Sequence, residues 1–212
     1  MKIKICGITN LADAQLCREL NVDFIGLIRA PSERRISLAD ATGIASKLGT
    51  HPQPVLLFRD SPIDEFVREV RGADVQWVQL HGGENAAFAA EARAQLPGLR
   101  LIKAVEVIAG GAAAALRQNL TGLCEQMRPD VVVLDRPKGS GTAGFDDLRK
   151  AASVVRGLGV EVWCAGGLTP ENVGEAIRDG GFDGVDVARG VERSPGFKDA
   201  ELLRAFLRHL WQ

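Results

Sequence analysis

Two residues with reactive side chains stand at the ends of apolar runs in this 212-residue chain. Cys6 ends the first run, and Asp135 directly follows the run at residues 131–134. Alone, Cys6 is typical of a small apolar filler, and Asp135 of a cap for the next loop. A thiol and a carboxyl group that face one substrate can act as base and acid in proton transfer. The pair therefore favours catalysis more than either residue does alone.

Two glycine-bearing turns suggest a site for a phosphorylated ligand. Gly166 and Gly167 follow one apolar run, and Arg189 and Gly190 follow the next. Backbone N–H groups in such turns bind phosphate, although a single Gly-Gly pair is also common in ordinary turns. Arg189 has two interpretations, a bidentate partner of the phosphate or a solvated surface arginine.

The remaining histidine and cysteine residues predict no metal site and no disulfide framework. His81 has no second histidine or carboxylate cluster at ligand spacing. The four cysteines are scattered without CxxC pairing, which indicates reduced thiols. Cys17, Cys124 and Cys164 fall on predicted helix faces or inside an apolar strand, and we expect them to pack in the core.

Composition excludes several classes of protein. The chain is 46% hydrophobic and 25% charged, as expected of an ordinary globular domain. With 26 basic and 27 acidic residues, it offers no overall charge for nucleic acid or an anionic membrane. No apolar stretch approaches the roughly 18 residues of a membrane helix, and the first residues do not resemble a signal peptide. We expect a cytoplasmic protein without nucleic-acid or membrane partners.

Eight short runs rich in Ile, Val, Leu and Phe predict the strands that must position these residues. Their starts lie 20 to 32 residues apart, enough for one strand, one helix and two loops. The runs are residues 3–6, 24–28, 55–58, 75–80, 99–105, 131–135, 160–165 and 184–187.

Helix signals fill the segments between the runs. Thr9 and Asn10 predict one helix start, residues 61–62 (SP) another, and residues 169–171 (TPE) a cap with a first-turn proline. Residues 110–124 contain alanines that favour a helix and glycines that interrupt it.

Strict alternation of strand and helix leaves an open doubly wound sheet or a closed barrel. The count of eight favours a (βα)8 TIM barrel, an α/β fold, and the first turn reads CGITN rather than GxGxxG. No linker divides the chain, so residues 1–212 form one predicted domain. In such a barrel the active site lies at the carboxyl ends of the strands. The polar and glycine residues there are Cys6, Arg29, Asp60, His81, Lys103, Asp135, Gly166, Gly167 and Asp186.

Five motifs, in order along the chain, resemble those of the phosphoribosylanthranilate isomerase family. They are KICGIT at 4–9, VQLHG at 78–82, VLD at 133–135, AGGLTPENV at 165–173, and GVDV at 184–187 with GVE at 190–192 and PGFKD at 195–199. The resemblance implies a single (βα)8 barrel without cofactor or metal, acting in tryptophan biosynthesis. It implies an Amadori rearrangement of N-(5-phosphoribosyl)anthranilate to 1-(2-carboxyphenylamino)-1-deoxyribulose 5-phosphate, by a monomer or a homodimer.

By position, the resemblance makes Cys6 the base that removes the proton from ribose C2. Asp135 becomes the acid that protonates the furanose oxygen. Arg34, or Arg35 if the register shifts by one, holds the anthranilate carboxylate. Asp186 and His81 become substrate contacts, and the turns at Gly166-Gly167 and Arg189-Gly190 bind phosphate.

The roles of Cys6 and Asp135 set requirements on their pKa values. Near neutral pH such a base needs a thiol pKa below about 8.5, and such an acid needs a carboxyl pKa above about 3.9. For the thiol, Lys2, Lys4 or the helix start after Thr9 can lower the pKa; for the carboxyl group, apolar neighbours can raise it.

Three departures from the family pattern lie at the predicted mouth. Residues 27–32 (LIRAPS) form a loop one residue shorter than usual, residues 137–144 (PKGSGTAG) an altered glycine-rich loop, and Ala188 and Arg189 replace paired serines. Two alternatives therefore stand beside the isomerase. One is a diverged isomerase of another phosphorylated aminosugar, and the other is a non-catalytic binding barrel, which has no need of an acid and base pair.

Overall fold

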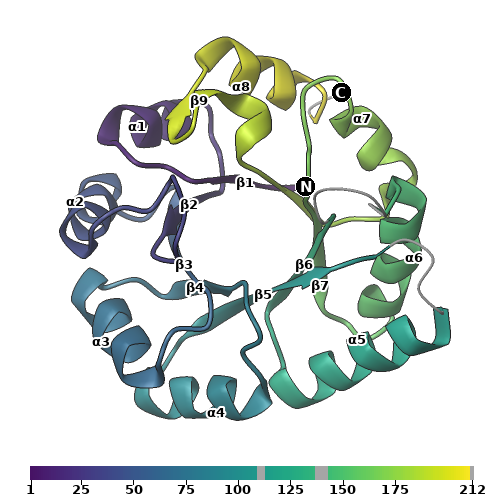
Figure 1. The fold of residues 1–212 in the computed structure, drawn as a ribbon. Helices are drawn as coiled ribbons and strands as arrows, with labels where there is room; N and C mark the ends of the chain where they lie inside the picture. The colour runs from purple at the N-terminus through teal and green to yellow at the C-terminus, as the bar shows by residue number, and fades with distance from the viewer. Residues whose placement is uncertain (109–112, 137–142, 211–212) are drawn as a thin grey trace.

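Eight parallel strands close into a barrel in the computed structural model, which describes residues 1–108, 113–136 and 143–210 (Figure 1). Each strand pairs with its neighbours in chain order, and β8 pairs with β1. The strands are β1 (Lys2–Cys6), β2 (Phe24–Ile28), β3 (Gln53–Phe58), β4 (Trp77–Leu80), β5 (Arg100–Glu106), β6 (Val131–Asp135), β7 (Glu161–Cys164) and β8 (Gly184–Val187). The fold is therefore the predicted (βα)8 TIM barrel.

Helices surround this ring of strands, as Figure 1 shows. They are α1 (Leu11–Glu19), α2 (Leu38–Leu48), α3 (Ile63–Ala73), α4 (Ala86–Gln95), α5 (Ala113–Met127), α6 (Phe145–Arg156), α7 (Val173–Ala176) and α8 (Ala200–Arg208), with the 3-10 turns η1 (Arg178–Gly180) and η2 (Arg189–Val191). None of the helices in the described ranges is long and apolar enough to cross a membrane.

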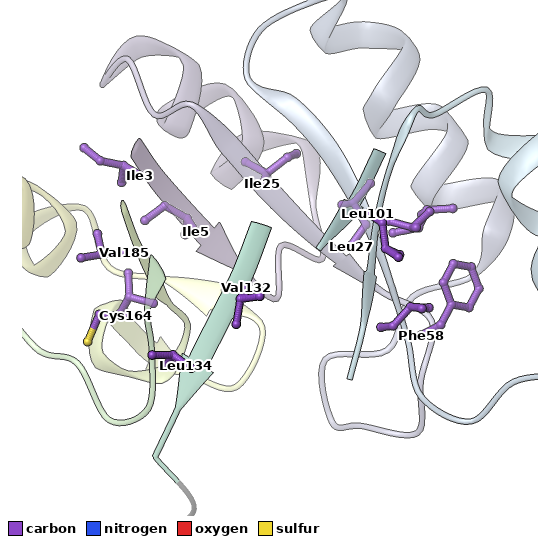
Figure 2. Packing of buried hydrophobic residues seen from close by; sticks show 14 of the residues in the cluster. Ile3, Ile5, Ile25, Leu27, Phe58, Leu101, Val132, Leu134, Cys164 and Val185 are labelled. Atoms are coloured by element: carbon purple, nitrogen blue, oxygen red, sulfur yellow. The ribbon is translucent and has the colours of Figure 1, made fainter. Parts of the chain in front are cut away.

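The alternation of residues along each strand separates an outer core from the barrel interior. On β1, Ile3 and Ile5 belong to the large apolar cluster that the strands share with the helices (Figure 2). The intervening Lys4 and Cys6 point to the other side, into the barrel. Lys4 is completely buried there, so its charge requires a partner inside the barrel.

Aromatic side chains fill the amino-terminal half of the barrel interior. Phe24 lies between Trp77 and Trp163, with ring centroids 5.1 and 5.0 Å away. Smaller apolar residues of β3, β5, β6 and β7 complete this inner cluster. These side chains fill the barrel below its mouth, as is usual for this fold.

All eight predicted strands are confirmed, with boundaries that shift by up to two residues. The predicted helix starts after Asn10 and Ser61-Pro62 are also confirmed, because Asn10 caps α1 and α3 begins after Pro62. Residues 110–124 do contain a helix, α5, although residues 109–112 lie outside the described residues. Cys17, Cys124 and Cys164 are buried as predicted.

The helix start predicted at residues 169–171 is wrong, because α7 begins at Val173 after the N-cap Asn172. The side chain of Asn172 accepts from the Thr169 N–H at 2.9 Å and donates to the Gly167 carbonyl at 2.9 Å. These two bonds hold the segment as a turn. The sequence also gave no expectation of a hairpin, β9 (Glu192–Ser194) with β10 (Phe197–Lys198), which lies between β8 and α8, near α1 in Figure 1.

Candidate active site

A cavity of about 700 Å³ opens at the carboxyl ends of the strands. A smaller cavity of about 390 Å³ adjoins it and shares much of its lining. Cys6, His81 and Asp135 line both cavities, from β1 and from the ends of β4 and β6. Cavities of this size hold small organic ligands. The structure therefore brings the predicted thiol and carboxyl group to the same space.

Cys6 lies in a crowded, charged environment. Behind it, the buried Lys4 ammonium group pairs with Asp186, with Nζ and Oδ2 2.9 Å apart. Gly26 of β2 leaves the space for this arrangement, because a Cβ there would meet Cys6 Sγ at 2.7 Å and Lys4 Nζ at 3.1 Å. The thiol and the ammonium group are therefore neighbours. Lys2 is excluded as that neighbour, since it pairs with Asp23 at a solvent-exposed site.

The expectation of a lowered thiol pKa is wrong for the protein without substrate. Burial raises the pKa of the Cys6 thiol above its ordinary value, since it removes water from the thiolate. Lys4 is the strongest influence in the opposite direction, and Lys198 adds to it, whereas Asp186 adds to the rise. A position at the end of a strand does not reveal this burial, and for that reason the sequence pointed the other way.

Asp135 occupies a more open position across the cavity. Its Oδ2 lies 3.4 Å from His81 Nε2, and both side chains are partly exposed. On the other side of the ring, His81 Nδ1 lies 3.3 Å from Gln79 Nε2. Gly166, at φ +87°, borders the carboxylate closely, because a Cβ there would meet Asp135 Oδ1 at 2.6 Å. Only glycine fits both the conformation and the space.

Arg34 lines both cavities and is held by Glu192. Arg34 Nη2 and Glu192 Oε2 are 2.7 Å apart, and the Nε also donates to this carboxylate. The hydrogen bond to Glu192 raises the pKa of the Arg34 guanidinium further. Arg35 is exposed and lines neither cavity. The sequence left the choice between Arg34 and Arg35 open, and the structure places Arg34 at the site.

An apolar wall adjoins Cys6 in the larger cavity, which Arg34 also lines. Ile28, Ala30 and Leu57 form a buried cluster with Cys6 and line the larger cavity. A flat aromatic ring with a carboxylate fits this combination, because the wall accepts the ring and the guanidinium accepts the charge.

The two glycine turns lie against each other and contribute to the lining of both cavities. A Cβ on Gly190 would collide with the carbonyl of Leu168, so the turns after β7 and β8 are in contact. The N–H groups of Gly166 and Gly167 donate to no acceptor among the described residues. Arg189 lines both cavities but is exposed. These turns can present backbone donors to an anion.

Arg136 is a residue of this site that the sequence reasoning missed. Its Nε donates to the Gly166 carbonyl at 2.8 Å, and its guanidinium lies 4.0 Å from the centre of the Phe145 ring. Its place directly after Asp135 was the only signal available. Arg59 and Glu106, also unpredicted, line the larger cavity. The altered loop at residues 137–142 lies outside the described residues.

Three strand-end candidates make structural contacts instead. Arg29 pairs with Glu69, with Nε and Oε2 2.7 Å apart, and Lys103 pairs with Glu84 at 3.1 Å. Asp60 accepts from the Gly83 N–H at 2.6 Å and fixes the turn after β4. None of the three lines either cavity.

Within the ranges that the structure describes, no cluster of three or more His, Cys, Asp or Glu side chains is arranged to hold a metal ion. The polar groups at the mouth are instead a thiol, carboxylates, an imidazole and arginines. Such a set suits proton transfer and anion binding.

Comparison with known proteins places this site in a family. Residues 3–209 match the family model of N-(5'-phosphoribosyl)anthranilate (PRA) isomerase. The isomerase of Hyphomonas neptunium is 37% identical over 211 residues, which cover 98% of this chain and 95% of the relative.

Solved structures agree with this result. The phosphoribosyl anthranilate isomerase of Thermus thermophilus superposes with a TM-score of 0.81 at 35% identity, over 100% of this chain and 98% of that one. A phosphoribosyl anthranilate isomerase in complex with reduced 1-(o-carboxyphenylamino)-1-deoxyribulose 5-phosphate has a TM-score of 0.82 at 29% identity, over 99% and 97% of the two chains. The chain therefore belongs to the phosphoribosylanthranilate isomerase family, as its site geometry and its motifs both indicate.

Proposed function

We propose that Cys6 and Asp135 carry the proton transfers by which this isomerase of tryptophan biosynthesis rearranges N-(5-phosphoribosyl)anthranilate. One observation supports this assignment above the others: the two groups come from opposite parts of the barrel and line one cavity of about 700 Å³. A single active domain spans residues 1–212 in this proposal.

The reaction begins at the furanose ring. Asp135, in its protonated form, gives a proton to the ring oxygen as the bond between that oxygen and C1 breaks. The nitrogen lone pair of the anthranilate forms the double bond to C1. Cys6, as thiolate, then removes the proton from C2, and the electrons of that bond neutralise the iminium nitrogen. The resulting enol-amine becomes the ketone of the product when C1 gains a proton and the C2 hydroxyl loses one.

Different residues of the cavity lining hold the two ends of the substrate. Arg34 binds the anthranilate carboxylate, and the wall of Ile28, Ala30 and Leu57 receives the aromatic ring. The turns at Gly166-Gly167 and Arg189-Gly190 bind the phosphate. Asp186 offers the substrate Oδ1, a buried oxygen without a hydrogen-bond partner among the described residues. His81 orients Asp135 and contacts the sugar.

The direct test is turnover by the purified protein. Addition of phosphoribosylanthranilate should cause a loss of anthranilate fluorescence, and the Cys6→Ala protein should cause none above background. A folded parent protein that leaves the fluorescence unchanged would instead favour the diverged isomerase. The same preparation tests two further expectations, a monomeric or homodimeric state and competition by inorganic phosphate. A cytoplasmic location stays a prediction of the sequence.

A further inference from the structure

The hairpin formed by β9 and β10 carries two buried charges that the proposed reaction does not use. The Glu192 side chain is 2% exposed and the Lys198 side chain is 0% exposed. Both belong to motifs that resemble the family, yet the sequence assigned neither a role. Burial of such charges is costly unless each one is paired, so their partners show what the hairpin does.

Lys198 connects the hairpin to the end of β1, where Cys6 lies. Its ammonium group donates to the Cys6 carbonyl at 2.6 Å, to Glu192 Oε1 at 2.8 Å and to the Ala188 carbonyl at 3.2 Å. An ammonium group has three N–H donors, so these bonds use all of them. The Lys198 backbone N–H also donates to Asp13 Oδ2 at 2.8 Å, at the start of α1. The backbone of Cys6 is thereby fixed from outside the barrel.

Glu192 connects the same hairpin to Arg34, which lines both cavities. Two bonds, Arg34 Nε to Glu192 Oε1 at 2.9 Å and Nη2 to Oε2 at 2.7 Å, form a bidentate pair. Burial alone raises the pKa of the Glu192 carboxyl group, but the bonds from Arg34 and Lys198 outweigh it and leave the pKa below its ordinary value. Glu192 is therefore ionised at neutral pH. Arg34 Nη1 makes no hydrogen bond within the described residues and remains available to a ligand.

We propose that Glu192 and Lys198 are positioning residues, which join the carboxylate-binding Arg34 to the backbone of Cys6 through one buried ion pair. The proposal rests on the proposed function. It means that the group which anchors the substrate and the group which removes its proton are held by the same hairpin. Small errors of position at a reacting centre reduce the rate steeply, and such a link prevents them.

A double-mutant cycle between Arg34 and Glu192 tests the first half of the link. Glu192→Gln should raise the KM for phosphoribosylanthranilate about 10- to 100-fold, as expected for the loss of a charged hydrogen bond. Arg34→Met should raise it at least as much. In the double variant the two factors should not multiply, because Glu192 acts only through Arg34.

The direction of the Glu192→Gln effect separates positioning from simple electrostatics. The substitution adds positive charge to the site, so an effect of charge alone would lower the KM. A lowered KM, or factors that multiply in the double variant, would overturn the proposal. If Glu192→Gln does not fold, Glu192→Asp keeps the charge but shortens the arm, and it should raise the KM by the same mechanism.

Lys198→Met tests the second half. It should lower kcat at least tenfold with KM within threefold of the parent, because it frees the Cys6 backbone and leaves Arg34 paired. The matched control is Lys150→Met on α6, a lysine with a 76% exposed side chain, which should leave both constants unchanged. Should Lys198→Met fail to fold, Lys198→Arg keeps the charge with a different donor geometry and should show the same loss of kcat.

An unchanged kcat in folded Lys198→Met would reject the link to Cys6. A parent protein without isomerase activity would reject the proposed function instead, so the two failures are distinct.

Discussion

The two sides of the cavity mouth are built differently. On the side of β1 and β8, Cys6 is 7% exposed and lies among three buried charges, Lys4, Asp186 and Lys198. On the side of β4 and β6, the Asp135 side chain is 22% exposed and lies 3.4 Å from His81. The thiol is thus fixed by the protein before substrate arrives. The carboxyl group keeps contact with water, and its surroundings are completed by what enters the cavity.

Removal of the Cys6 thiol should have the largest effect on turnover. We expect Cys6→Ala to lower kcat by about 10³- to 10⁴-fold with little change in KM, because a base acts on the transition state more than on the bound substrate. Steady-state fluorescence measures both constants. Cys164→Ala is the matched control, since that thiol faces the outer core. Activity of Cys6→Ala within threefold of the parent would reject Cys6 as the base.

Removal of the Asp135 carboxyl group should have a smaller effect on turnover. Asp135→Asn should lower kcat by at least about 10²-fold, since the amide cannot supply the proton. Asp130→Asn is a suitable control, because Asp130 precedes the same strand at its other end and pairs with Arg100. A near-normal kcat for Asp135→Asn would leave this residue with a structural role only.

The charges around Cys6 can be tested without substrate. In the Lys4→Met, Asp186→Asn double variant the ammonium group is gone, so the thiol pKa should rise and alkylation of Cys6 by iodoacetamide at pH 8 should slow about tenfold. Asp186→Asn alone removes the anion and leaves the cation, so its Cys6 should react faster than in the parent. Mass spectrometry of the Cys6 peptide measures both rates. Identical alkylation rates in the three proteins would show that Lys4 does not influence the thiol.

Arg189 should have the smallest effect. Its side chain is exposed, so its bond to phosphate is screened by water, and Arg189→Ser should raise the KM only about two- to threefold at low salt. The turnover number should stay the same, because phosphate is held alike in the ground and transition states. The difference should disappear as salt rises. Equal KM values at low salt would assign Arg189 to the solvated surface.

The sequence predicted those parts of the fold and site that depend on the pattern of neighbouring residues along the chain. Apolar runs end where strands end, so Cys6, His81 and Asp135 could be located by counting along the chain. The family resemblance then supplied roles for them. Their joint position at one cavity follows from the closed barrel, which the count of eight strands had favoured.

The sequence could not predict features that depend on contacts between residues far apart in the chain. Arg29 follows β2 directly, and Lys103 lies within β5, but each pairs with a glutamate, Glu69 or Glu84, instead of lining the cavities. Glu192 lies 158 residues from the arginine it holds. The prediction of a lowered pKa for the Cys6 thiol was wrong for the same reason. Burial of the thiol is a property of the closed barrel and not of the segment that contains it.

The aromatic packing below the mouth gives this molecule a simple optical property. The chain has no tyrosine and three tryptophans, of which Trp77 and Trp163 contact Phe24 inside the barrel, while Trp211 lies outside the described residues. Near-ultraviolet circular dichroism detects aromatic rings held in asymmetric surroundings, so the contribution of Trp77 and Trp163 should report on this cluster. Its signal follows closure of the strands into a ring, and far-ultraviolet dichroism follows the helices outside it. Comparison of the two during unfolding would show whether the ring opens before its surrounding helices melt.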